Sequence, residues 1–143
     1  MISCVLSVCS ETVVIDRLSN FVSAINIFET ISIESFPVVI PRVFCLFELV
    51  REHGDPLQLP GLVTFKLGDT EITRTPYDID FQGAFRTRTV LNIQGLVVAG
   101  PGTLRVSIDA DGKTLGHWDI LCEGRPAQIK FPLQEERNSL AVD

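Results

Sequence analysis

The stretch VSIDADGKTLGHWDI, residues 106–120, contains the densest set of groups in the chain that could bind a metal ion. Asp109 and Asp111 stand two apart beside a glycine, as in a calcium-binding loop. An EF-hand loop needs alternating oxygen ligands, a glycine at its sixth position and a glutamate at its twelfth. Counted from Asp109, the fifth position is Lys113 and the twelfth is Ile120, so the pattern does not fit calcium.

The same stretch predicts a β-hairpin instead, because glycine adopts the positive φ that a tight turn after Asp111 requires. A plain two-residue turn would place His117 opposite the apolar Val106. A three-residue turn, or a bulge at Gly116, restores Trp118 opposite Val106. We predict one of these two arrangements.

His117 and Asp119 then lie together on the outer face of the sheet, but a metal site needs a third ligand, and His53 is the only other histidine. His53 stands between Glu52 and Asp55 and could act as an acid–base group, yet no nucleophile accompanies it. The sequence also has no nucleophile elbow, zinc-protease motif or phosphate-binding glycine loop. We therefore expect no catalytic residues, no metal and no cofactor.

The segment FRTRTV places Arg86 and Arg88 on one face of a strand. Planar guanidinium groups recognise carboxylates and phosphates, so these two arginines are the candidate ligand-binding residues for a small anion. The alternative is cross-strand pairing with Asp78 and Asp80, which also share a face.

The four cysteines are scattered through apolar runs and form no Cys-x-x-Cys pair. They are expected to be reduced, buried thiols that act as small hydrophobic residues. The first residues carry no basic group before their apolar run, and no apolar stretch is long enough to span a bilayer. These features predict a cytoplasmic protein.

Strand periodicity dominates the rest of the chain. Apolar and polar residues alternate over 63–67, 77–81 and 104–109, and glycine or proline separates the runs. The pattern predicts an all-β fold, a single-domain antiparallel β-sandwich of two sheets with roughly eight or nine strands. We expect this one domain to span residues 1–143, with 134–143 as a frayed tail.

Two segments, 43–50 and 13–33, are apolar on both strand faces. Such strands lie at the centre of a sandwich or face a partner subunit. The second segment also permits a helix, since Leu18, Phe21, Ile25 and Phe28 recur at spacings of three and four, but its many β-branched residues favour strands.

The segments NFVSAINIFETISIESFP, PRVFCLFELVREHGDP, YDIDFQG, LNIQGL and PGTLRVSIDADGKTLGHW together resemble a family of small bacterial proteins of unknown function. The likeness covers about residues 4–122. It implies a bacterial single-domain β-sandwich and supplies no catalytic residues.

The net charge of −6 argues against binding to nucleic acid or to anionic lipid, since both require a basic surface, and we expect no nucleic-acid partner and no membrane partner. Apolar strand surface and a mean hydropathy of +0.28 favour a non-enzymatic protein-interaction or assembly module of a bacterial complex, with a protein partner or a homo-oligomer. The alternatives are a binding domain for a small anionic ligand that uses Arg86 and Arg88, and, less favoured, a metal-dependent hydrolase.

Overall fold

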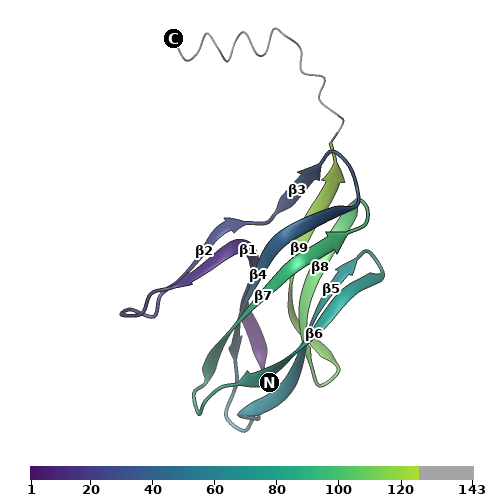
Figure 1. Ribbon diagram of the computed structural model, residues 1–143. Helices are drawn as coiled ribbons and strands as arrows, with labels where there is room; N and C mark the ends of the chain where they lie inside the picture. The colour runs from purple at the N-terminus through teal and green to yellow at the C-terminus, as the bar shows by residue number, and fades with distance from the viewer. Residues whose placement is uncertain (126–143) are drawn as a thin grey trace, which may run out of the picture.

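The computed structural model describes residues 1–125, in which every regular element is a β-strand. The strands form a four-stranded sheet, β2-β1-β4-β7, and a five-stranded sheet, β3-β9-β8-β5-β6 (Figure 1). Their bounds are β1 Ser3–Ile15, β2 Val22–Ile27, β3 Thr30–Ile33, β4 Val38–Val50, β5 Gln58–Leu67, β6 Thr70–Asp80, β7 Arg86–Val98, β8 Gly102–Ala110 and β9 Lys113–Gly124. The all-β prediction is confirmed. The predicted tail, 134–143, lies outside the described residues.

One strand pairing differs from the expected antiparallel pattern: β3 pairs with β9 in parallel. Phe28 and Glu29 carry the chain from β2, at an edge of the four-stranded sheet, to β3 at an edge of the other. The Phe28 N–H donates to the carbonyl of Cys9, and the Leu121 N–H donates to the carbonyl of Glu29. The segment that crosses between the sheets is therefore hydrogen-bonded to both of them. A prediction that assumes only antiparallel hairpins does not include such a crossing.

Both sheets contribute side chains to one buried cluster. Strand β4 presents Val43, Cys45, Phe47 and Leu49 at every second position, because alternate residues of a strand share a face. In the five-stranded sheet, alternate residues of the runs 63–65 and 104–108 pack into the same cluster, as the alternation in the sequence predicted. All four cysteines are free; three are buried and Cys4 is half-buried, as expected for small hydrophobic residues.

The predicted two-sided apolar strand is β4, which lies between β1 and β7. Leu46 is only 2% exposed although it points away from Cys45 and Phe47. Its neighbour across the ladder, Val8, is buried as well, so the outer face of this sheet has a small apolar centre of its own. The helix considered over residues 18–28 is wrong, since 22–27 form strand β2.

The register predicted for the β8–β9 hairpin is confirmed. Asp111 and Gly112 form a two-residue turn with φ of 51° and 70°. The ladder shifts after Ile108, which pairs with Gly116, and Trp118 then lies opposite Val106. The bulge thus keeps the indole on the core side.

Within the part of the chain that the structure describes, no helix has the length and apolar character needed to cross a bilayer.

Candidate functional site

An open groove of about 1060 Å³ lies over β6, β5, β8 and β9 of the five-stranded sheet. We call it the polar groove. Its side chains come from the strand positions that point away from the core, and the ladder aligns them in rows across the four strands.

The first row crosses the sheet as Glu71, Lys66, Arg105 and Asp119, each directly opposite the next. Arg105 Nε donates to Asp119 Oδ1 at 2.8 Å, and Arg105 Nη2 donates to Asp119 Oδ2 at 2.9 Å. These hydrogen bonds lower the pKa of Asp119 and raise that of Arg105, so both groups are charged at neutral pH. The pair is an internally neutral, doubly hydrogen-bonded unit on the groove surface.

The second row consists of Arg74, Thr64, Ser107 and His117. Thr64 is buried and Ser107 is half-buried, so their hydroxyl groups form the floor. Arg74 also pairs with Glu71 through two hydrogen bonds of 3.0 and 2.7 Å, which connects the two rows at the β6 side.

The third row contains Leu62, Asp109 and Thr114. Thr114 Oγ1 donates to Asp109 Oδ1 at 2.6 Å. The aspartates of the sequence motif thus serve the hairpin and the groove edge rather than a calcium ion.

His117 and Asp119 share the outer face, as predicted, with Nε2 and Oδ2 3.9 Å apart, which is beyond hydrogen-bonding distance. Within residues 1–125, no group of three or more His, Cys, Asp or Glu side chains is arranged to hold a metal ion.

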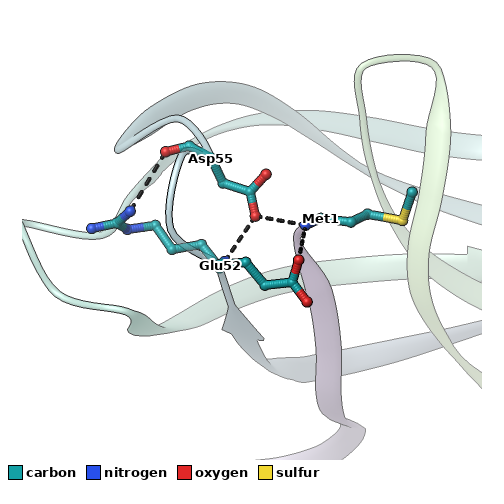
Figure 2. Close-up of polar contacts among 4 residues, drawn as sticks. Met1, Glu52 and Asp55 are labelled. Atoms are coloured by element: carbon teal, nitrogen blue, oxygen red, sulfur yellow. Dashed lines mark hydrogen bonds and ion pairs between the residues drawn. The ribbon is translucent and has the colours of Figure 1, made fainter.

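A second polar cluster surrounds the α-amino group of Met1 (Figure 2). This group lies 2.6 Å from Glu52 Oε2 and 2.9 Å from Asp55 Oδ2. Its pKa is raised by the hydrogen bond to Glu52 first, and the pKa of Asp55 is lowered by its bond to the amine. The carboxylates next to His53 are therefore engaged with the amine.

Arg86 and Arg88 are held by a carboxylate other than the ones considered from sequence. Arg86 Nη2 lies 3.1 Å from Glu48 Oε2, and Arg88 Nε lies 3.7 Å from Glu48 Oε1. Pairing with Asp78 and Asp80 is wrong, because β7 lies beside β4 rather than β6. Arg88 also donates to the carbonyl of Asn20, at 3.2 Å, so it anchors the β1–β2 turn. A ligand role for Arg86 and Arg88 stays a prediction.

Sequence reasoning missed most of the groove. Thr64, Lys66, Arg74 and Arg105 lie on three different strands, and each was an ordinary polar position in an alternating run. The sequence does show that each of these residues lies on the polar face of its strand. Recognising that they form one groove also requires the order of the strands in the sheet.

Neither a protein-family model nor a curated protein sequence matches this chain. Among solved structures, it is similar to one described as "Pseudomonas fluorescens alkylpurine DNA glycosylase AlkC bound to DNA containing an abasic site analog". The TM-score is 0.44 and the identity 13% over 66% of this chain. The matched part is 27% of the glycosylase, and the similarity is too distant to give this chain that activity.

Two of our expectations disagree with this match. We predicted a non-enzymatic protein-interaction or assembly module and excluded nucleic acid, whereas the matched protein is an enzyme bound to DNA. The exclusion rested on the net charge of the whole chain, which is a sum over all faces and does not describe the potential at any one of them. Neither expectation is retained.

Proposed function

We propose that the polar groove binds a neutral, hydroxyl-rich ligand, and that its chemical class is a saccharide. The observation that carries this proposal is the set of rows of paired donors and acceptors across β6, β5, β8 and β9. An open groove over four strands also suits an extended chain rather than a compact molecule.

The charges of the groove favour a ligand without net charge. Its lining has three basic side chains, Lys66, Arg74 and Arg105, and four carboxylates. Two of the basic groups are bound to carboxylates through two hydrogen bonds each. An anion would meet the unpaired carboxylates, and a cation would meet Lys66, so neither sign is selected.

The hydrogen-bonding capacity that remains fits hydroxyl groups. Arg105 uses its Nε–H and one Nη2–H on Asp119, which leaves further N–H groups to donate, and Asp119 keeps free lone pairs to accept. Neighbouring sugar hydroxyls each donate and accept, and they can bridge such a donor–acceptor unit. Thr64 and Ser107 offer the same dual capacity at the floor.

The expected affinity is low. The described lining residues include no Phe, Tyr or Trp ring on which a sugar could stack, so binding depends mainly on hydrogen bonds that replace those with water. A dissociation constant of about 1 mM, or roughly 4 kcal/mol, is the expected scale.

The test is a titration of the ¹⁵N-labelled protein with maltotetraose and cellotetraose, followed by amide chemical shifts. Shifts confined to the groove strands are expected. Arg105→Gln should weaken binding about tenfold, the value of one charged hydrogen bond. Arg86→Gln is the matched control, because Arg86 is also an exposed strand arginine with a carboxylate partner but lies outside the groove.

Inorganic phosphate and a short oligothymidylate serve as anionic comparison ligands in the same titration. Groove shifts with either of them, and none with the tetrasaccharides, would contradict the proposal. Equal loss of tetrasaccharide binding in both arginine variants would contradict it too.

We infer further that the two sheets pack as the β-sandwich of one domain, supported by the single core cluster to which both contribute. A reducing, cytoplasmic location is supported by the four free thiols, two of which, Cys9 and Cys45, have sulfur atoms 3.7 Å apart.

A further inference from the structure

We propose that the turn between β1 and β2, residues 16–21, inserts into a lipid surface of zwitterionic headgroups. We call this turn the hairpin tip. It lies at the far end of the β1–β2 hairpin, which extends to one side of the molecule (Figure 1). This site is separate from the polar groove and does not depend on it, and it departs from the expectation of no membrane partner, which rested on net charge alone.

Two large apolar side chains occupy the hairpin tip. Leu18 is 99% exposed and Phe21 is 75% exposed, the two highest values among the large apolar residues described; the next is the terminal Met1 at 72%. Exposed Leu and Phe together at one projecting turn are unfavourable in water and favourable at a membrane interface.

Four backbone N–H groups of the tip have hydrogen-bond partners within the tip. Asp16 Oδ1 accepts from the N–H groups of Leu18 and Ser19 at 2.8 and 3.0 Å. The Asn20 N–H donates to the carbonyl of Asp16 at 2.8 Å, and the Phe21 N–H donates to Ser19 Oγ at 3.2 Å. Four successive N–H groups thus need no water, which matters because an unpaired backbone group in lipid is costly.

The apolar surface continues on both faces of the hairpin. Val14 and Ile15 are successive residues, point to opposite faces and are 47% and 45% exposed. A protein partner covers one face, whereas lipid can contact the exposed apolar side chains of both faces, although Arg88 holds the turn through the Asn20 carbonyl. The two tip side chains also present far less area than the roughly 1,200 Å² of a stable protein interface.

Charge selects the kind of lipid. Arg17 is exposed beside Leu18 and forms no ion pair within residues 1–125, so it can meet a lipid phosphate. The Asp16 carboxylate is turned back into the turn, as its two N–H bonds show. One free cation cannot outweigh a net charge of −6 near an anionic surface, so apolar insertion into phosphatidylcholine is the expected mode.

The test is co-sedimentation with large vesicles of pure phosphatidylcholine. The wild-type protein should bind, and the double variant Leu18→Ser, Phe21→Ser should lose roughly 100-fold in partitioning, because burying each side chain is worth more than a factor of ten. The matched control is Leu57→Ser, Phe85→Ser, which removes one Leu and one Phe of about half exposure elsewhere and should bind as the wild type does. Circular dichroism checks that both variants fold.

A second measurement uses Leu18→Trp. Its fluorescence should shift to the blue when vesicles are added and should be quenched by brominated lipid, whereas the one native tryptophan, Trp118, is half-buried and bonded to the carbonyl of Phe28.

Three results would overturn the proposal. They are no binding of the wild-type protein at millimolar lipid, equal binding of the tip variant and the wild type, and a dimer in solution that is lost only in the tip variant. The last result would assign the tip to a second copy of the chain.

Discussion

Gly61 on β5 lies where no side chain fits, and replacing it tests the packing of the five-stranded sheet. An ideal Cβ at this position would be 2.8 Å from the carbonyl oxygen of Tyr77 and 2.9 Å from Ile79 Cδ1. The isoleucine terminus can rotate away, but the Tyr77 oxygen belongs to the backbone of the paired strand β6. The two strands must therefore separate by a few tenths of an ångström.

The expected magnitude for Gly61→Ala follows from two opposing effects. Overpacking of this kind costs about 1–3 kcal/mol. Restricting the unfolded chain returns about 0.4–1 kcal/mol, because Ala has fewer accessible conformations than Gly. The net loss of unfolding free energy should be about 1–2 kcal/mol, which lowers Tm by roughly 4–8 °C in a chain of this size.

Urea unfolding followed by the fluorescence of Trp118 measures the change. Gly100→Ala is the matched control, since its Cβ would meet no atom within 4 Å and its stability should stay within about 1 kcal/mol of the wild type. Equal stability of Gly61→Ala and Gly100→Ala would refute the close approach of β5 and β6 at Gly61.

Three further predictions concern the core, the β8–β9 bulge and the groove. Phe47→Ala should lower the unfolding free energy by about 3–5 kcal/mol in urea titrations, because Phe47 is fully buried; a loss below 1 kcal/mol would contradict its central position. Gly116→Ala should lower the unfolding free energy by about 1–3 kcal/mol, since its Cβ would lie 2.5 Å from Cys4 Sγ. In a double-mutant cycle, adding Cys4→Ala to the same chain should recover part of that loss. The pKa of Asp119 is lowered by its bond to Arg105, so its contribution to stability is present above the ordinary value of 3.8 and is lost as the pH falls through the lower folded-state value. An NMR titration of the Asp119 carboxyl carbon should show this low midpoint in the wild type and a return toward 3.8 in Arg105→Gln, and an unchanged midpoint would refute the pairing.

The parts of the fold that depend on local pattern were predictable. The β8–β9 register followed from a simple conflict: Val106 needs an apolar neighbour, and an unbulged hairpin would supply His117. The bulge before Gly116 resolves it by moving Trp118 into place. Alternation and turn chemistry carry this information within fifteen residues.

The parts that depend on strand order were not predictable from one sequence. Arg86 and Arg88 needed a carboxylate on a neighbouring strand, and Glu48 supplied it because β7 lies beside β4. The groove has the same origin, since Arg105 meets Asp119 and Lys66 only after β5, β8 and β9 are aligned. Local pattern gives the face of each residue, but the neighbour across the ladder is a property of the topology.

The parallel pairing of β3 with β9 has a consequence for the order of folding. Ser32 on β3 and Glu123 on β9 are hydrogen-bonded across 91 positions of sequence. Contacts so distant in the chain carry a large loop-closure entropy and form late. During synthesis, β3 has no partner strand until residue 124 has left the ribosome, so Ile31 and Ile33 remain unpaired while the first eight strands are already present. The pairing of β3 with β9 therefore requires that all nine described strands have been synthesised.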